Sequence, residues 1–266
     1  DPNRISEIKL DKYEMNLKVT EKDIAYVTML PEMVANKDEV WTTSNEKVAT
    51  VDSWGNVTAI GMGECIVTVT SVDNPSVKAE IKVIVSGAGD IQQVHNITYI
   101  NGILVVNKSY ALPSDYDPKM NEEAMQQFNV LAESARAEGL SIYLSSGYRS
   151  YSYQETIYNN YVLWNGQEIA DTFSARAGHS EHQTGLAIDV NTIDDSFADT
   201  PEAKWLAEHA HEYGFIVRYP EGKEDITGFK YEPWHIRYLG IEKATEVYNS
   251  GLTLEEFLGI DSYYHS

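Results

Sequence analysis

Cysteine is almost absent from this sequence, which has one, Cys65, in 266 residues. A single cysteine excludes an intrachain disulfide, so the fold cannot depend on one. Cys65 begins an alternating run, Cys65–Val69, that predicts an inward-facing position on a strand. Because apolar burial raises the pKa of a thiol and lowers its reactivity, we expect a buried, inert side chain here rather than a nucleophile.

Long apolar runs are absent too. No stretch of about 18 consecutive apolar residues, the length that a helix needs to span a bilayer, occurs in the sequence. No transmembrane segment is therefore predicted. The sequence starts at Asp1-Pro2 without the charged and apolar regions of a secretory signal, so any export signal would have been removed or would lie outside it. Export is left open.

Basic residues are scarce relative to acidic ones: 20 Lys and Arg stand against 41 Asp and Glu, for a formal net charge of −21 at pH 7. Proteins that bind nucleic acid need clustered Lys and Arg to neutralise phosphates, so no nucleic-acid partner is expected. Anionic membranes are disfavoured for the same reason. A negatively charged ligand would have to be bound by local groups.

Short alternating runs broken by turn residues fill the sequence from Ile5 to about Val85. Period-two patterning, repeated at spacings of about 8–12 residues, predicts an all-β sandwich. Asp52–Asn56 is predicted to be a turn between two of its strands. The segment Ser86–Asp90 has the small, flexible composition of a linker, so a domain boundary is expected there.

Three segments of this region resemble the bacterial immunoglobulin-like group 2 domain: Trp41–Asp52, Gly55–Ala59 and Gly63–Val69. In that family the domain is usually a spacer or adhesive module of exported surface proteins, so the resemblance implies an extracellular or cell-wall location. No residue of the region looks catalytic. We expect an immunoglobulin-like sandwich over residues 1–88 and a second domain over residues 89–266.

Beyond the linker the pattern changes to interspersed helices and strands. The predicted strands cover residues 103–106, 141–147, 186–190 and 216–219. One helix is expected to begin at Asp117-Pro118 and end at Gly139, and two more to cover residues 150–164 and 200–214. This order predicts an α+β domain whose central antiparallel or mixed sheet is flanked by helices.

Two separated segments of this second domain, Ser180–Asp189 and Glu232–His235, hold the residue types of a catalytic metal site. Zinc enzymes that activate water use three nitrogen or oxygen ligands, leave a fourth position open and keep a carboxylate nearby. The two segments offer three ligands and a base: His182, Asp189, His235 and Glu232.

Taken singly, these residues have ordinary structural interpretations. Asp189 can be ion-paired at a strand end, and Glu232 can be an exposed acid beside a hydrogen-bonded His235. A strand over residues 186–190 places Asp189 among apolar neighbours, however, where an unpaired carboxylate is strongly unfavourable and a metal would supply the partner. The joint pattern is far harder to obtain by chance than any of its parts.

The joint pattern resembles the zinc D-alanyl-D-alanine carboxypeptidases of the vancomycin-resistance type and their L,D-carboxypeptidase relatives. The resemblance extends from about residue 96 to the C-terminus and includes Ser145–Glu155 and Phe173–Ser180, with Ala177 where the family often has Pro. It implies a Zn²⁺ cofactor and a role for Arg149 in steadying the substrate carbonyl or its oxyanion. The ligands and the catalytic base that it implies are the same four residues: His182, Asp189, His235 and Glu232.

A carboxypeptidase must also bind the free carboxylate of its substrate, a task suited to hydroxyl and amide donors close to the metal. If the released residue is D-alanine, the pocket is expected to be small. Four residues of the matching motifs carry such donors: Ser180, Gln154, Tyr148 and Ser146.

The resemblance thus implies a secreted or wall-associated enzyme that removes the terminal D-alanine from peptidoglycan stem peptides, and we expect a monomer. L,D-cleavage of a tetrapeptide is slightly favoured over D,D-cleavage of a pentapeptide, because Ser180–Ala187 and Gly147–Tyr151 look closer to the L,D relatives. Two alternatives stay open. One is a non-catalytic cell-wall-binding or adhesive protein, which predicts loss of a ligand or of the base; the other is an endopeptidase that cuts cross-bridges.

Overall fold

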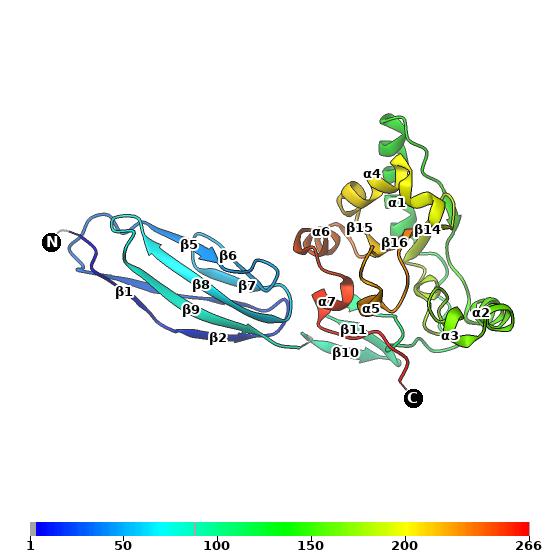
Figure 1. The fold of residues 1–266 in the computed structure, drawn as a ribbon, viewed down its shortest axis with the longest axis horizontal. Coiled ribbons are helices and arrows are strands. Elements are labelled where there is room, and N and C mark those ends of the chain that lie inside the picture. The colour runs from blue at the N-terminus through cyan, green and yellow to red at the C-terminus, as the bar shows by residue number, and fades with distance from the viewer. Residues whose placement is uncertain (1–3, 88, 266) are drawn as a thin grey trace. The chain divides into compact units, whose positions relative to one another are not determined.

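The computed structural model describes residues 4–87 and 89–265 (Figure 1). Two compact units divide the chain: one extends to Gly89 and takes in Glu256–Ile260, and the other comprises Asp90–Glu255 and the residues from Asp261 on. Ala88, where the sequence predicts the end of the first domain, lies outside the described residues. No helix in the described part of the chain is both long and apolar enough to cross a bilayer.

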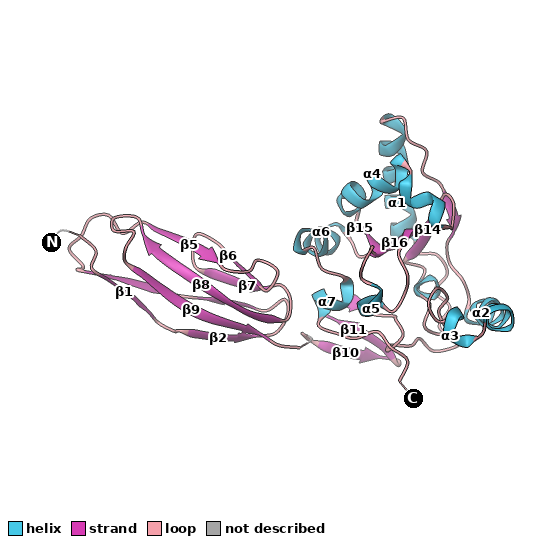
Figure 2. Ribbon diagram, viewed as in Figure 1, coloured by secondary structure: helices cyan, strands magenta, loops and turns pink. Residues whose placement is uncertain are grey.

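The first unit is built from strands, and its described residues up to Gly87 contain no helix (Figure 2). One sheet has the order β2-β9-β8-β5, with β2 and β9 parallel, a second has the order β3-β7-β6, and β1 pairs with β4. The strands are β1 (Glu7–Leu10), β2 (Glu14–Leu17), β3 (Lys22–Ile24), β4 (Val27–Leu30), β5 (Glu39–Thr43), β6 (Ala49–Val51), β7 (Asn56–Ala59), β8 (Gly63–Ser71) and β9 (Lys78–Val85).

Alternation of buried and exposed side chains accounts for these strands. On β8 the side chains of Cys65, Val67 and Val69 are buried, and the residues between them are half-buried. Burial raises the pKa of the Cys65 thiol, in agreement with the inert role predicted for it. The Asp52 carboxylate closes the predicted turn by accepting hydrogen bonds from the backbone N–H groups of Trp54 (2.8 Å) and Asn56 (2.9 Å). The all-β prediction is confirmed.

The second unit contains a central antiparallel sheet of order β13-β14-β16-β15 and a small antiparallel sheet of order β10-β11-β12. The α+β prediction is therefore confirmed. Of the two predicted kinds of central sheet, antiparallel and mixed, the structure has the antiparallel one. The strands of the unit are β10 (Ile91–Val94), β11 (Ile97–Ile100), β12 (Ile103–Leu104), β13 (Leu144–Ser146), β14 (Ala187–Val190), β15 (Phe215–Tyr219) and β16 (Glu232–Tyr238).

Some of the helices lie beside the central sheet (Figure 2). The α-helices are α1 (Glu122–Ala137), α2 (Tyr151–Asn165), α3 (Gln167–Ala170), α4 (Pro201–His209), α5 (Glu224–Thr227), α6 (Ile241–Ser250) and α7 (Leu254–Leu258). Short 3₁₀ turns form η1 (Glu181–Thr184), η2 (Asp195–Asp199) and η3 (Ala210–Tyr213).

The start predicted for the first helix, at Asp117-Pro118, is wrong. The helix begins four residues later, where Asn121 is the N-cap and its side-chain oxygen accepts a hydrogen bond from the backbone N–H of Ala124. Lys119 adopts a positive φ of 62°, which interrupts any helix that runs through it. A proline next to an aspartate is a weaker signal than a capping amide with the right geometry.

The central sheet separates an apolar layer from a polar one. Ile188 and Val190 of β14, together with Trp234 and Ile236 of β16, share one buried core with residues of α1 and α4. Because successive residues of a strand point to opposite faces, the intervening residues of β14 and β16 point away from that core. Asp189 is one of them, and it lies directly across from His235 in the antiparallel register.

Gly185 connects η1 to β14 and adopts a left-handed conformation with φ of 70°. A Cβ atom at this position would lie 2.0 Å from the backbone oxygen of Lys119. The Gly185 carbonyl also accepts a hydrogen bond of 3.0 Å from the N–H of Asn121, the cap of α1. This glycine therefore allows the turn that carries His182 to dock against the segment before α1.

We predict that Gly185→Ala destabilises the second unit much more than Gly102→Ala does. Gly102 has a similar φ of 77°, but a Cβ atom at that position would meet no other atom within 4 Å, so it is a matched control. The control isolates backbone strain, about 1 kcal/mol, and the clash at Gly185 adds roughly 1–3 kcal/mol. Urea unfolding of both variants measures the difference. Equal losses of unfolding free energy in the two variants would show that the Lys119 backbone moves away from the new Cβ atom without an energetic cost.

Candidate active site

A cavity of about 320 Å³ lies on the polar face of the central sheet. Its lining residues come from β13, α2, η1, β14, β15 and β16, and include all three predicted metal ligands and the predicted base. Segments far apart in sequence thus meet at one cleft. The structure brings together His182, Asp189, Glu232 and His235 as the sequence predicts.

His182 lies on η1 and is held in one tautomer. Its Nδ1 is 2.7 Å from the carbonyl oxygen of Gly147, and because a carbonyl only accepts, Nδ1 must carry the proton. Burial lowers the pKa of His182 to about 4, so the ring is neutral near pH 7 and Nε2 has a free lone pair. Nε2 is buried and has no partner in hydrogen-bonding geometry, although Asp189 Oδ2 lies 3.1 Å away.

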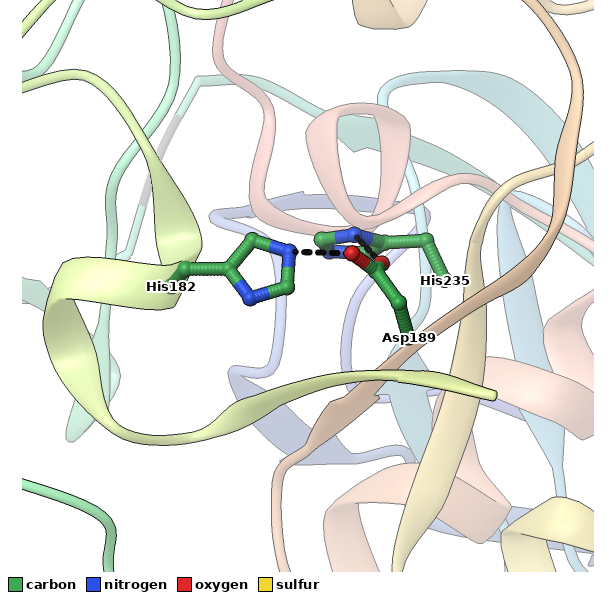
Figure 3. A group of neighbouring side chains, drawn as sticks. All are labelled: His182, Asp189 and His235. Carbon is green, nitrogen blue, oxygen red and sulfur yellow. Dashed lines mark hydrogen bonds and ion pairs between the residues drawn. The ribbon is translucent and has the colours of Figure 1, made fainter. Parts of the chain in front are cut away.

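Asp189 and His235 face each other across neighbouring strands, and Figure 3 shows their side chains converging with that of His182. Asp189 Oδ1 lies 3.0 Å from His235 Nδ1. The other ring nitrogen, Nε2, lies 3.3 Å from a carboxylate oxygen of Glu181. Burial alone would lower the pKa of His235, but the hydrogen bonds to Asp189 and Glu181 raise it to about 9.

These three side chains fit a metal ion. Each offers one ligand atom, and the three atoms lie within 4.8 Å of one another among buried groups. The unpartnered lone pair of His182 Nε2 is what a metal would satisfy, since a buried nitrogen without a partner is otherwise unfavourable. Two imidazoles and one carboxylate are a donor set that zinc accepts in catalytic sites, with a further position left open.

Glu232 stands at the start of β16 with its side chain on the same cleft. Residues three apart on a regular strand point to opposite faces, but the register of β15 with β16 shifts between Val217 and Tyr219, which lets Glu232 and His235 share a side. Glu232 Oε2 lies 4.0 Å from His235 Nδ1. Burial raises the pKa of Glu232 to about 7, a value suited to accepting and returning a proton.

Arg149 brings a positive charge to the cleft. Its Nη2 donates to Asp189 Oδ2 at 2.9 Å, and its Nη1 donates to the side-chain oxygen of Gln154 at 3.1 Å. The Nε–H group is buried without a hydrogen-bond partner. The backbone N–H of Arg149 donates to the carbonyl of His182, which ties the arginine to the 3₁₀ turn that carries this histidine.

Of the four residues predicted to bind substrate, three line the cleft and one does not. Ser146, Gln154 and Ser180 line the cleft, and Gln154 is fixed there because its amide donates to the carbonyl of Ala175 at 2.7 Å. Tyr148 is not among the lining residues. Its hydroxyl donates to Asp117, in the segment before α1, and its role in binding substrate stays a prediction.

Sequence reasoning missed a buried ionic cluster next to the ligands. Glu181 Oε1 accepts from Arg218 at 2.7 Å and from Arg237 at 2.8 Å, and Arg218 also pairs with Glu255. All four side chains are at most 1% exposed. The available signal was alternation: Arg218 and Arg237 interrupt two apolar strands, where a buried guanidinium needs carboxylate or carbonyl partners.

Three convergent candidate ligands, a buried carboxylate and an arginine are the parts of a hydrolytic enzyme of the metallopeptidase class. Comparison with known proteins agrees: the D-alanyl-D-alanine carboxypeptidase family (VanY) matches residues 117–241, and the bacterial Ig-like domain (group 2) matches residues 7–81. The bifunctional D-Ala-D-Ala dipeptidase and carboxypeptidase VanXYC of Enterococcus gallinarum is 35% identical over 59% of this chain and 94% of its own. The chain belongs to the D-alanyl-D-alanine carboxypeptidase family.

Solved structures agree with that membership. The LdcB LD-carboxypeptidase is 41% identical, covers 68% of this chain and all of its own length (100%), and superposes with a TM-score of 0.62. The vancomycin-resistance D,D-pentapeptidase VanY in complex with Zn(II) is 36% identical over 58% of this chain and 97% of its own, with a TM-score of 0.52. This chain is a carboxypeptidase of peptidoglycan peptides preceded by an immunoglobulin-like domain.

We predict that one Zn²⁺ binds per chain and raises the melting temperature, since a ligand that binds only the folded state stabilises it. His182→Ala and Asp189→Asn should weaken zinc binding by more than about 100-fold. Residues that only hydrogen-bond to a metal-coordinating side chain typically change the affinity by about 10–100-fold when they are replaced. His209→Ala, whose ring contacts exposed Glu212, is the control. Isothermal titration measures the affinities, and wild-type affinity in Asp189→Asn would exclude this site.

Proposed function

We propose that this chain is a zinc-dependent L,D-carboxypeptidase that removes the C-terminal D-alanine from the tetrapeptide stems of peptidoglycan. The observation that carries the proposal is the buried group of His182, Asp189 and His235 with Glu232 on the same cleft. A cell-wall or extracellular location is in keeping with such a substrate and with the immunoglobulin-like domain. The enzyme acts as a monomer.

Each residue of the cleft has a separate role in peptide hydrolysis. Zinc held by His182, Asp189 and His235 would polarise the scissile carbonyl and lower the pKa of a water molecule toward ~7. Glu232, whose pKa is about 7, accepts the proton of the attacking water and delivers it to the leaving amine. Arg149 donates to the carbonyl oxygen as negative charge develops there, and its buried Nε–H is a further donor without a partner.

Recognition of the released residue rests on neutral donors. Ser180 is buried on the cleft, and Gln154 is held by both Arg149 and the carbonyl of Ala175. A hydroxyl and an amide at fixed positions suit a terminal carboxylate, which accepts several hydrogen bonds. Ser146, at the end of β13, is placed across from Asp189 and is the third such donor.

Preference for the L,D bond is supported by relatives rather than by the metal ligands, which would be common to both reactions. The LdcB LD-carboxypeptidase is similar to 68% of this chain at 41% identity, whereas the D,D-pentapeptidase VanY is similar to 58% at 36% identity. The extra coverage and identity favour the L,D reaction. D,D-cleavage of pentapeptides is the alternative that the substrate panel below distinguishes.

We predict that Glu232→Gln lowers kcat by about 10²–10⁴-fold while one zinc stays bound, because the amide cannot accept the proton. Glu224→Gln, an exposed position at the start of α5, serves as the matched control and should retain full activity. Mass spectrometry of defined tetrapeptides and pentapeptides identifies the product. Release of D-alanine from pentapeptides alone would replace L,D by D,D specificity. Failure of the zinc-loaded wild type to release any residue would support a non-catalytic wall-binding protein.

A further inference from the structure

Residues 261–264 connect two segments that border the active-site cleft. The hydroxyl of Ser262 donates to the carbonyl of Thr227 at 2.7 Å, in the segment that leads to β16. The hydroxyl of Tyr264 accepts a hydrogen bond of 3.0 Å from the backbone N–H of Arg176, in the segment that leads to η1. Both segments contribute residues to the cleft lining, and none of the residues 261–264 does. Residues 261–264 can therefore act on the cleft only through these neighbours.

The side chain of Tyr264 is held between neighbours. The guanidinium carbon of Arg176 lies 3.8 Å from the centroid of its ring, and the ring of His179 meets it edge to face with centroids 5.1 Å apart. Arg176 is fixed in turn by Asp171, which accepts from its Nε at 3.2 Å and from its Nη2 at 2.8 Å. A ring packed between two such groups has few alternative rotamers, so its hydroxyl has a defined position.

The hydrogen bond from Arg176 to Tyr264 orients a peptide group that also contacts a cleft residue. The N–H of Arg176 belongs to the same peptide group as the carbonyl of Ala175, which accepts from the side-chain amide of Gln154 at 2.7 Å. A peptide group is planar, so its N–H and its carbonyl can only rotate together. The hydroxyl of Tyr264 therefore fixes the direction of the carbonyl that holds Gln154.

Gln154 extends this chain of hydrogen bonds to Arg149. Its Nε2 donates to Ala175, and its Oε1 accepts from Arg149 Nη1 at 3.1 Å. If the amide were turned over, Nε2 would face the guanidinium and Oε1 would face the carbonyl, and both hydrogen bonds would be lost. Hydrogen bonds in such a chain polarise one another, so those that connect Tyr264 to Arg149 strengthen each other. The second N–H of the Gln154 amide is left for the substrate.

We propose, on the basis of the function proposed above, that Tyr264 is a positioning residue of the carboxypeptidase. Through the peptide group that it anchors, its hydroxyl holds the Gln154 amide in the orientation that binds the substrate carboxylate. Arg149 has a second anchor, because its Nη2 donates to Asp189 at 2.9 Å. Loss of the Tyr264 hydroxyl therefore affects the binding of substrate more than the stabilisation of the oxyanion.

The test is Tyr264→Phe, which removes the hydroxyl and keeps the packed ring. KM for release of D-alanine, measured with the stem peptide that the wild type cleaves best, should rise about fivefold while kcat stays nearly constant, the effect of one lost hydrogen bond. A purely structural role would instead reduce the fraction of active enzyme, which lowers kcat and leaves KM unchanged. Tyr263→Phe is the matched control: it removes the same atom from a ring that is 54% exposed and should change neither constant.

A double-mutant cycle shows whether the effect passes through Gln154. In a Gln154→Ala background the chain of hydrogen bonds is already broken, so adding Tyr264→Phe should change KM by less than about twofold. If the wild type is active, an equal rise of KM in both backgrounds overturns the positioning role, and so does a wild-type KM in Tyr264→Phe alone. If the wild type releases no residue from any peptide, the proposed function fails, and the role of Tyr264 that rests on it fails too.

Discussion

The buried carboxylate of Glu181 is the constraint on which the active site depends. It accepts from Arg218 on β15 and from Arg237 on β16 with one oxygen and faces His235 with the other. Burial alone would raise its pKa, but the two arginines and His235 lower the pKa below the usual range, so it stays charged. Removing one member of such a buried pair typically costs about 3–5 kcal/mol, because the partner is left uncompensated. The cluster therefore locks two strands, the turn that carries His182 and the His235 ring into one unit. The raised pKa of His235 places a proton on each ring nitrogen near pH 7, so a metal would bind Nδ1 in exchange for its proton while Nε2 still donates to Glu181.

The geometry of the sheet explains why the site lies where it does. β14 and β16 each send alternate residues into the apolar core beneath α1 and α4, and the remaining positions of both strands meet on the opposite face. On that face Asp189 and His235 are direct cross-strand neighbours, so the register alone sets their separation. His182 comes from outside the sheet and needs a separate device, which is the left-handed turn at Gly185 and the hydrogen bond to Gly147. A rigid sheet thus positions two of the candidate ligands, and a sharply folded turn positions the third.

Much of this arrangement could be predicted from the sequence, because local patterns encode it. Period-two alternation predicts the strands of the first unit, and the spacing within Ser180–Asp189 and Glu232–His235 predicts the metal group. Long-range partners could not be predicted in the same way. Arg218 and Arg237 lie 37 and 56 residues from Glu181, and no local pattern couples them. The start predicted for α1 is wrong because Asp117-Pro118 has the residue types of a helix N-terminus. The side chain of Asn121, four residues later, makes the capping hydrogen bond. The placement of Tyr148 depends on Asp117, 31 residues away, which accepts from its hydroxyl.

The acidity of the chain and its activity on peptides that end in a carboxylate are compatible because electrostatic effects act over short distances. At physiological ionic strength exposed charges are largely screened beyond about 8 Å, so most of the net charge of −21 is not felt inside the cleft. Groups within that distance decide binding, and those that line the cleft include the cations Arg149 and Lys230, the acid Glu232 and the neutral donors of Gln154 and Ser180. Two of the buried carboxylates beside the cleft have fixed partners: Asp189 pairs with Arg149 and faces His235, and Glu181 pairs with two arginines. Because these two carboxylates have fixed partners, Glu232 is the remaining acid of the cleft, and its raised pKa of about 7 leaves it partly protonated near neutral pH.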